Sequence, residues 1–382
     1  MFDHIIYYVH PVCSKSEEFT LGVEEEYQII HPDTRELRSR VQAILPQAQA
    51  VLGDQVTPEL YRSQIEIGTA VCHQLTQVRQ ELSHLRRQVI AAADKEGSLI
   101  AASGTHPFSH WDEQKLTAKK RYAEIATSYQ QLAREQLIFG CHVHVGIPNR
   151  ELAIQVMNRS RPWLASLLAL ACNSPFWLGV DTGYASFRTE IWGRWPTAGI
   201  PQTFNSWAEY EGVIAQLVAV GSISDSSKIY WDVRPSSHYN TLEFRVTDVC
   251  LTVDEAVMIA GLIRALARTC ADEAERFVDS SPVRPEVLRA AHWQAARFGL
   301  DDALIDTSAG RSVPARELIE KLLTFVRPAL EEYGEWKEVS QLVKAVLRHG
   351  TGAARQRKVY AKNENLQDVV DLIVAETAKA GK

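Results

Sequence analysis

Pairs of ionisable side chains, spaced two residues apart in short strand-like segments, constrain the fold of this chain more than any other feature. The pairs are Glu24 with Glu26, His142 with His144, and Glu243 with Arg245. Side chains at positions i and i+2 of a β-strand point to the same face of a sheet. The residues that alternate with the second and third pairs are apolar. The pattern therefore predicts a sheet with one face packed on helices and one ionisable face.

The remaining periodicities predict a mixture of helices and adjacent strands. We expect strands at about residues 19–30, 63–69, 138–147, 227–233 and 240–248. We expect helices at about 75–89, 119–137, 149–170, 252–275, 285–298, 314–333, 335–349 and 364–380. Strands and helices do not alternate evenly, and some strands are neighbours in sequence. This order favours the α+β class with a largely antiparallel sheet over a doubly wound parallel sheet.

The ionisable face predicts a site for divalent cations. Each pair alone is more typical of a solvated face or a surface ion pair. Glu66, in the apolar segment Gln64–Ile67, adds a further carboxylate. If these strands are neighbours, the converging carboxylates repel one another unless cations lie between them. Carboxylate-rich ligation with one imidazole favours Mg²⁺ or Mn²⁺ over Zn²⁺, and such ions beside an arginine suit phosphoryl transfer.

Glycine-rich phosphate-binding motifs are absent from the sequence, since it contains neither GxxxxGK[ST] nor GxGxxG. We therefore expect any ATP to be held by metals and arginines. A loop rich in aromatic residues, glycines and arginines runs from Asn173 to Pro201 and contains Arg188 and Arg194. Long loops of this kind in compact domains tend to be functional. Arg234, on a predicted strand edge, and Arg297, at a predicted helix end, are further candidates for the same cleft.

The composition excludes several classes of protein. The chain has 41 Lys and Arg against 47 Asp and Glu, for a net charge of −6, so a general nucleic-acid binder is not expected. The six cysteines form no CxxC pair and are expected to be buried thiols in a reducing cytosol. The N-terminus has no basic leader, and the longest uncharged stretch contains Asn173 and Pro175, so we expect no membrane span. The prediction is a cytoplasmic enzyme or binding protein.

Nine segments together resemble one family, the bacterial carboxylate–amine ligases of the glutamate–cysteine ligase type 2 group. The segments are Leu21–Tyr27, Glu66–Thr69, Gly140–Gly146, Asn173–Pro175, Asp181–Tyr184, Pro196–Pro201, Trp231–Pro235, Thr241–Arg245 and Gly350–Ala353. The resemblance implies a glutamine-synthetase-like catalytic fold, with an antiparallel sheet forming a funnel. It covers residues 18–382 as a single catalytic domain whose part from about 282 onwards is helical. Residues 1–17 are expected to be an N-terminal extension.

The same resemblance implies an ATP-dependent ligase that activates a γ-carboxylate as an acyl phosphate, which an amine then attacks. The implied metal ligands, for Mg²⁺ or Mn²⁺, are Glu24, Glu26, Glu66, His142 and Glu243, with Glu59 as a looser match. Arg245, together with Glu243, is implied to act on the transferred phosphate. The remaining candidates, for phosphate, nucleotide or substrate, are Arg188, Arg194, Arg234, Arg297 and His144.

Two other functions are open at this stage. In a zinc-dependent amide hydrolase, His142, His144 and Glu243 would bind zinc, and the other carboxylates would have no role. A non-catalytic sensor of nucleotides or amino acids would keep the scaffold without turnover. The expected partners are small molecules, with glutamate and cysteine as the default pair, and neither nucleic acid nor membrane. A homo-oligomer is left open, with a dimer favoured.

Overall fold

A twisted antiparallel sheet organises the molecule, which is described here by a computed structural model covering residues 18–278 and 283–379. Within these ranges the main sheet has seven strands, in the order β2-β3-β1-β5-β9-β8, with β4 also paired to β1. All of its pairings are antiparallel. The strands are β1 (Leu21–Ile30), β2 (Val56–Pro58), β3 (Gln64–Gly68), β4 (Leu99–Ala101), β5 (Gly140–Gly146), β8 (Val233–Pro235) and β9 (Thr241–Asp248). The predicted α+β class with an antiparallel sheet is confirmed.

Helices cover one face of this sheet because the strands turn apolar side chains toward them. The helices α2 (Leu75–Lys95), α6 (Leu164–Ala171) and α9 (Val253–Glu275) contact β1, β5 and β9. α6 is buried along its whole length and is apolar apart from Ser166. α9 begins at a capping box in which Thr252 and Glu255 satisfy each other's backbone N–H groups. The opposite face of the sheet is left for polar side chains.

One charged residue of β1 lies on the helix-covered face. Glu25 alternates with Glu24 and Glu26, so its carboxylate points toward α2. There Arg86 donates from Nη2 to Glu25 Oε1 at 2.5 Å and from Nε to Glu25 Oε2 at 2.9 Å. Both side chains are buried. Burial of the Glu25 charge is thus compensated by a two-pronged guanidinium contact.

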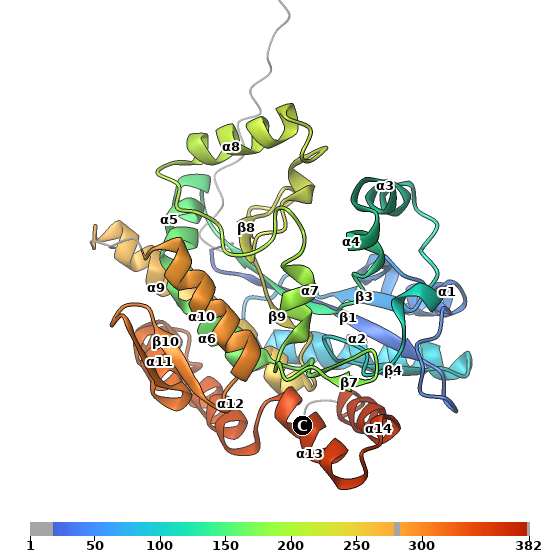
Figure 1. Cartoon of the computed structure of the whole chain (residues 1–382). Coiled ribbons are helices and arrows are strands. Elements are labelled where there is room, and N and C mark those ends of the chain that lie inside the picture. Colours follow the sequence, from blue (N-terminus) through green and yellow to red (C-terminus); the bar gives the residue numbers. More distant parts are fainter. Residues whose placement is uncertain (1–17, 279–282, 380–382) are drawn as a thin grey trace, which may run out of the picture.

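The remaining elements surround the sheet (Figure 1). α13 and α14 lie together at the bottom of that view, and α8 lies at the top, away from the sheet. The helices are α1 (Val41–Leu52), α3 (Lys120–Tyr129), α4 (Gln131–Arg134), α5 (Arg150–Ser160), α7 (Phe187–Trp192), α8 (Trp207–Ala219), α10 (Pro285–Phe298), α11 (Ala315–Glu332), α12 (Trp336–His349), α13 (Gly352–Asn363) and α14 (Leu366–Thr377). Two small hairpins pair β6 (Phe176–Trp177) with β7 (Val180–Asp181) and β10 (Ala303–Asp306) with β11 (Arg311–Pro314).

The predicted strand over 227–233 is wrong. A 3-10 turn, η5 (Ser226–Lys228), occupies its first part, and β8 begins only at Val233. The side chain of Asp225 accepts a hydrogen bond from the backbone N–H of Ser227 at 2.9 Å. Such a contact stabilises a turn and competes with strand pairing.

Two predicted helices are interrupted, and others were not predicted. The helix predicted over 149–170 is split by the 3-10 turn η4 (Arg161–Trp163), since Pro162 lacks the N–H that a continuous helix needs. The helix predicted over 119–137 breaks at Gln130, which has a φ of 50°. The helices α1, α7, α8 and α13 have no counterpart among the predicted helices.

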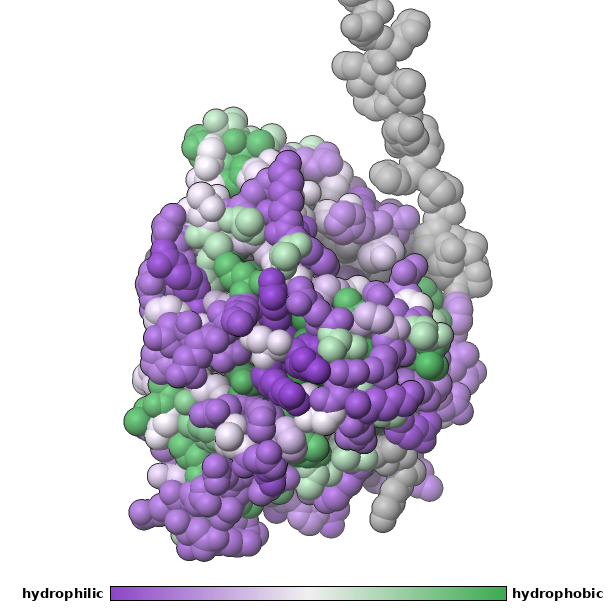
Figure 2. All heavy atoms as spheres, turned by 90° about the vertical axis from the view of Figure 1, so that its right-hand side faces the viewer, coloured by the Kyte–Doolittle hydropathy of each residue, from purple (hydrophilic) through white to green (hydrophobic). Residues whose placement is uncertain are grey.

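The surface hydropathy and the burial of the cysteines agree with what the composition predicts. Figure 2 shows one face of the molecule as mostly hydrophilic, with its hydrophobic residues in small separate groups. No helix in the described ranges combines the length and the apolar character needed to cross a membrane. The cysteines in these ranges are buried free thiols, and Cys13 lies outside them, as does the predicted extension over residues 1–17.

Candidate active site

The strand registers bring the predicted ionisable residues into one row across the sheet. Cross-strand neighbours in an antiparallel pair have side chains on the same face, about 5 Å apart. The neighbours here are Glu24 and His142, Glu26 and Glu66, His144 and Glu243, and Arg234 and Glu243. Segments separated by more than two hundred residues in sequence thus contribute to one polar surface.

Two adjoining clefts open on this surface. The first has a volume of about 410 Å³. The predicted site residues that line it are Glu24, Glu26, Glu59, Glu66, His142, His144, Arg188, Arg234, Glu243 and Arg245. The second, of about 750 Å³, shares Glu24, Glu66, His144 and Tyr239 with the first. These four shared side chains therefore lie where the two clefts meet.

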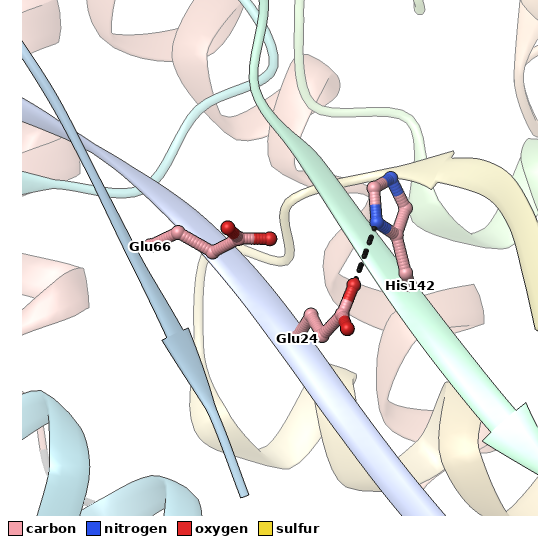
Figure 3. A group of neighbouring side chains, drawn as sticks. All are labelled: Glu24, Glu66 and His142. Atoms are coloured by element: carbon pink, nitrogen blue, oxygen red, sulfur yellow. Dashed lines mark hydrogen bonds and ion pairs between the residues drawn. The ribbon is translucent and has the colours of Figure 1, made fainter. Parts of the chain in front are cut away.

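Glu24 is central to two groups of side chains with the geometry of metal ligands. One group is Glu24, Glu66 and His142, and the other is Glu24, His144 and Glu243. In each group, one ligand atom per residue lies within 4.8 Å of the others. In Figure 3 the Glu24 and His142 side chains point toward each other, with Glu24 Oε2 at 3.2 Å from His142 Nδ1, and Glu66 lies beside them. Two carboxylates and one imidazole in each group fit Mg²⁺ or Mn²⁺.

The carboxylates at this surface are buried close to one another, and the pKa values of three of them are raised. Burial and the nearby charge of Glu59 raise the pKa of Glu26 to about 7. Burial, followed by the charges of Glu24, Glu59 and Glu26, raises the pKa of Glu66 well above its ordinary value. Burial also raises the pKa of Glu59. Without a cation, this side of the cleft therefore favours protonated carboxyl groups.

The two histidines have different electrostatic surroundings. Burial, with a contribution from the Arg245 charge, lowers the pKa of His142 to about 4, so its imidazole is neutral at pH 7. A neutral imidazole has a lone pair available for a metal ion. Burial acts to lower the pKa of His144 too, but contact with Glu24 outweighs burial and raises it. Burial acts to raise the pKa of Glu24, yet contacts with both histidines hold it well below its usual value.

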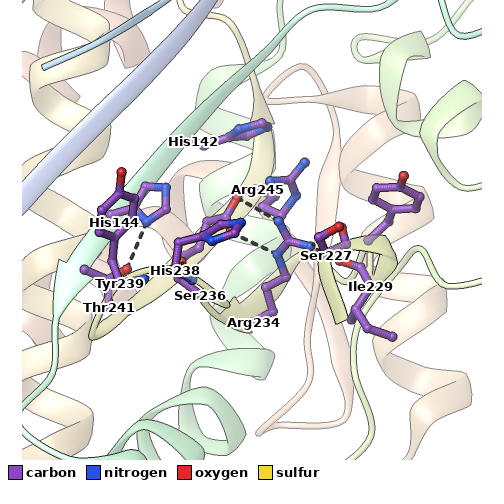
Figure 4. A network of polar contacts seen from close by, with 12 residues as sticks. His142, His144, Ser227, Ile229, Arg234, Ser236, His238, Tyr239, Thr241 and Arg245 are labelled. Atoms are coloured by element: carbon purple, nitrogen blue, oxygen red, sulfur yellow. Dashed lines mark hydrogen bonds and ion pairs between the residues drawn. The ribbon is translucent and has the colours of Figure 1, made fainter. Parts of the chain in front are cut away.

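Arg234 and Arg245 lie close together in the cleft (Figure 4), and both contact Glu243. Arg234 Nε donates to Glu243 Oε2 at 2.9 Å, and Arg245 forms a close ion pair with Glu243 Oε1. Burial acts to raise the pKa of Glu243, but the charges of Arg245 and Arg234 outweigh it and hold this pKa well below its usual range. Glu243 is thus an ionised carboxylate that holds Arg245 in the cleft.

Arg188, on α7, also extends into the first cleft, close to Arg245. Its side chain is buried, its Nε has no hydrogen-bond partner within the described ranges, and it donates from Nη2 to the Arg245 backbone oxygen at 3.3 Å. Arg188 and Arg245 both lie over the Trp192 ring, at 5.7 and 5.2 Å from its centroid. A Cβ on Gly140 would lie 2.5 Å from Arg188 Nη2, so a side chain there would displace the guanidinium. The cleft therefore contains two guanidinium groups that lie over one tryptophan ring and have unused hydrogen-bond donors.

Two predicted residues lie elsewhere. Arg194 pairs with Glu135, and Arg297 donates to the Gly183 backbone oxygen. Neither is among the described residues that line the two clefts. Arg194 instead borders a smaller pocket of about 270 Å³. The expectation that both arginines join the cleft is therefore corrected.

Several residues that line the first cleft were not predicted from the sequence. Tyr122 of α3 donates to Glu59 Oε2 at 2.9 Å, and Arg121, Trp195 and Tyr230 line the first cleft. None of these four belongs to a strand with alternating ionisable residues. The only signal for Trp195 was its place in the aromatic loop, and Tyr230 lay in the segment predicted as a strand.

The chain has clear relatives. Residues 20–372 match the model of a family described as glutamate-cysteine ligase family 2. A protein of Rhodopirellula baltica named "Putative glutamate--cysteine ligase 2" is 42% identical over 94% of this chain and 96% of its own length. A protein of Frankia alni named "Putative glutamate--cysteine ligase 2-3" is 43% identical over 95% of this chain, which spans only 42% of that protein.

Solved structures show the same fold at low sequence identity. A glutamate–cysteine ligase from Francisella tularensis, in complex with AMP, has a TM-score of 0.70 at 12% identity, over 96% of this chain and 89% of that one. A bifunctional glutathione synthetase from Pasteurella multocida has a TM-score of 0.70 at 16% identity, over 95% of this chain and 53% of that one. The likeness covers the sheet and its surrounding helices, and it confirms the predicted glutamine-synthetase-like fold.

Proposed function

Because the chain belongs to glutamate-cysteine ligase family 2, we propose that it is an ATP-dependent ligase that joins a carboxylate to an amine. The γ-carboxylate of glutamate or a similar acid is the proposed acyl donor, and an amino acid or amine such as cysteine is the acceptor. The observation that carries the proposal is the pair of ligand groups that share Glu24 and lie next to Arg245.

The chemistry explains why such a cleft is useful. A carboxylate is a poor acyl donor, because its leaving group would be oxide. Transfer of the terminal phosphoryl group of ATP to the carboxylate oxygen releases ADP and converts that oxygen into part of a phosphate leaving group. Attack by the amine on the acyl carbon then forms the amide and releases phosphate and a proton. The first step brings two anions together, and the second develops negative charge on the acyl oxygen and the departing phosphate. Positive charge in the cleft therefore lowers both barriers.

The metal groups have a definite place in this proposal. Glu24, Glu66 and His142 would hold one divalent cation, and Glu24, His144 and Glu243 a second. Bound Mg²⁺ or Mn²⁺ would supply positive charge that offsets repulsion between the phosphates and the substrate carboxylate. Glu26 and Glu59 lie in the same cleft and are further candidates.

The arginines have a separate part. We assign Arg245 to the transferred phosphoryl group, because Glu243 holds it beside both ligand groups. Arg188 has unused donors and a fixed position over Trp192, which suits recognition of a substrate carboxylate. Arg234 supports Glu243 on its other side. The reaction needs no protein nucleophile.

The zinc hydrolase hypothesis fits the geometry less well. It requires His142, His144 and Glu243 around one ion, whereas the two histidines fall in different ligand groups of the described residues. It also leaves Glu66 and Arg245 without a role. The sensor hypothesis is tested by turnover.

The decisive experiment measures phosphate release from ATP and Mg²⁺ with pairs drawn from a panel of amino acids and amines, with mass spectrometry of the products. We expect phosphate release that requires both substrates, with a new amide in equal amount. Arg245→Gln should reduce turnover at least a hundredfold, since removal of a single charge-stabilising donor typically costs about 10²–10³ in rate. Arg194→Gln is the matched control, because this arginine lies outside the cleft, and it should retain turnover within about twofold.

Three results would reject the proposal. One is the absence of phosphate release with every pair in the panel. Another is hydrolysis without ATP in a zinc-loaded sample. The third is near-normal turnover in Arg245→Gln, which would contradict the role assigned to Arg245 in phosphoryl transfer.

A further inference from the structure

Arg161 is a buried arginine whose guanidinium group has no partner among residues 18–278 and 283–379. It lies in η4, between α5 and α6, and is only 3% exposed. Within the described ranges no ion pair or hydrogen bond reaches its side chain, and its Nε is enclosed without an acceptor. Burial lowers the pKa of Arg161, and no carboxylate among the described residues offsets this effect. An unpaired buried charge is costly, so its retention calls for a ligand or another compensating group.

Arg161 borders a hollow of about 930 Å³, which we call the Arg161 pocket. The pocket lies among α5, η4, the start of α10, the β10–β11 hairpin and α11. Its main lining residues for this argument are Arg159, Arg161, Trp163, Leu288 and Phe325. It shares no described lining residue with the two clefts of the candidate active site. The inference is therefore independent of the proposed function.

A second guanidinium, that of Arg159, is only weakly satisfied in the Arg161 pocket. Its side chain is 9% exposed, and its Nη1 lies 3.9 Å from Glu273, too far for a hydrogen bond. Nη2 donates to the Val278 backbone oxygen at 2.9 Å, while Nε and Nη1 have no hydrogen-bond partner in the described ranges. Two guanidinium groups with unused donors therefore meet one pocket.

The acidic residues of the pocket do not neutralise Arg161. Asp306 is held by Lys321 and accepts hydrogen bonds from Ser308 and Ala309. Glu273 faces Arg159 and not Arg161. Arg284, a third arginine on the rim, is exposed and paired with Glu286. Among the described residues, the Arg161 guanidinium is therefore left without a carboxylate partner, and that of Arg159 is only weakly paired.

An apolar wall completes the pocket. The Trp163 ring stacks on Phe325, with centroids 4.8 Å apart and an interplanar angle of 21°. Both residues border the pocket beside Leu288. Ordered aromatic and aliphatic side chains beside convergent polar donors are typical of small-molecule sites.

We propose that the Arg161 pocket binds a small organic anion. Its carboxylate or phosphate is held by the forked donors of Arg161 and Arg159, and its apolar body lies against Trp163 and Phe325. A planar guanidinium recognises either anion through paired hydrogen bonds, so the recognised chemistry is an oxyanion on an apolar group.

The test measures binding of three probes to the full chain by isothermal titration calorimetry. The probes are phenylacetate, phenyl phosphate and the neutral phenylacetamide, so the first two arms separate carboxylate from phosphate recognition. We expect at least one anionic probe to bind at least tenfold more tightly than phenylacetamide. Arg161→Met should abolish this preference. It should also leave the unliganded protein at least as stable to heat, since it removes an unpaired buried charge.

Matched variants locate the site. Arg284→Gln should keep the affinity within about twofold, because this exposed arginine is already paired. Arg245→Gln should also keep it, which separates this pocket from the active-site clefts. Arg159→Gln provides a second test of the pocket if Arg161→Met does not fold, and it should weaken binding of the anion at least threefold.

The proposal is overturned if the probes show no saturable binding, or if phenylacetamide binds as tightly as both anions. Unchanged affinity in a folded Arg161→Met protein, or in Arg159→Gln when the former does not fold, would overturn it as well. Loss of binding in Arg245→Gln would move the anion to the cleft and would also reject it.

Discussion

At the scale of single residues, His106 shows how hydrogen bonds select one form of a side chain. Its Nδ1 accepts from the backbone N–H groups of Phe108 and Ser109, at 3.2 and 2.9 Å. Its Nε2 lies 2.9 Å from the Arg35 backbone oxygen and therefore carries the hydrogen. This arrangement needs a neutral ring, and burial lowers the pKa of His106 to about 3.

The protein should therefore lose stability in mild acid through His106. The folded pKa lies below the ordinary value of about 6.5, so the contribution of His106 is complete above pH 6.5 and falls as the pH drops toward 3. At pH 5 the loss is about 2 kcal/mol, at 1.36 kcal/mol per pH unit. His106→Asn keeps an acceptor for the two N–H groups but cannot titrate. Urea unfolding at pH 7.5 and pH 5 should show a smaller pH effect in this variant, and equal pH effects would refute the assignment.

The residues of the candidate site divide into those that sequence reveals and those that it does not. Alternation within a strand is local, so it placed Glu24 with Glu26 and His142 with His144 correctly on shared faces. Contacts from other elements are not local. No sequence pattern shows that Arg86 of α2 meets Glu25, or that Arg297 ends in a hydrogen bond to a backbone oxygen.

At the scale of elements, the start of α13 is fixed against the loop that follows α6. The Ala353 N–H donates to the Cys172 backbone oxygen at 3.0 Å, and Gln356 Nε2 donates to Asn173 Oδ1 at 2.8 Å. The Asn173 N–H in turn donates to Asp248 Oδ2, at the end of β9, at 2.7 Å. This chain of contacts links the C-terminal helices to the strand that carries Glu243 and Arg245.

Gly352→Ala should loosen this contact. A Cβ at Gly352 would overlap the side-chain amide of Asn173. Better helix propensity would stabilise the variant by at most about 1 kcal/mol, whereas overpacking costs about 1–3 kcal/mol, so we expect net destabilisation. Gly212→Ala in α8 is the control, because its Cβ meets no atom within 4 Å, and it should gain about 0.5–1 kcal/mol. Denaturant unfolding measures both, and stabilisation of both variants would contradict the proposed overlap.

Elements with a strong period were predictable, and those set by single contacts were not. α2 and α9 followed from regular apolar spacing and from the Thr252 capping box. η5 and the break at Gln130 depend on one side-chain hydrogen bond and one positive φ. Such local choices outweigh propensity without leaving a periodic signal.

At the scale of the whole molecule, the buried carboxylates of the cleft repel one another, and the same carboxylates can bind protons or divalent cations. Burial, and secondarily the nearby charge of Glu59, raises the pKa of Glu26 to about 7, so the folded protein binds a proton there more readily. Since this folded pKa lies above the ordinary value of 4.5, the associated stability is present in acid and is lost as the pH rises from 4.5 to 7. Divalent cations could take the place of these protons.

Mg²⁺ should therefore stabilise the protein more at pH 8 than at pH 5.5. Binding to the folded state at a hundred times Kd contributes about 2.7 kcal/mol, and competition with protons weakens binding at the lower pH. Thermal unfolding with and without Mg²⁺ measures the effect. Glu66→Gln should reduce it, and Glu320→Gln, on an exposed part of α11, should not. An equal effect of Mg²⁺ at both pH values would contradict exchange of protons for cations.

The topology of the whole molecule was only partly open to prediction. The antiparallel sheet followed from strands that are adjacent in sequence, and the row of ionisable residues followed once those strands were taken as neighbours. The insertion of β4 beside the second half of β1, and the place of α13, depend on contacts across long stretches of chain.

The three consecutive glutamates of β1 add to the alignment of this strand, which its alternating buried residues Val23 and Tyr27 also favour. A slip of one residue against β3 and β5 would turn Glu25 into the cleft and drive Glu24 and Glu26 toward α2. Arg86 pairs with a single carboxylate there, so the slipped register would leave a second carboxylate unpaired in the apolar core. Arg86 thus favours the native register of β1. It thereby helps to place Glu24 and Glu26 on the cleft face of the sheet, although it contacts neither of them.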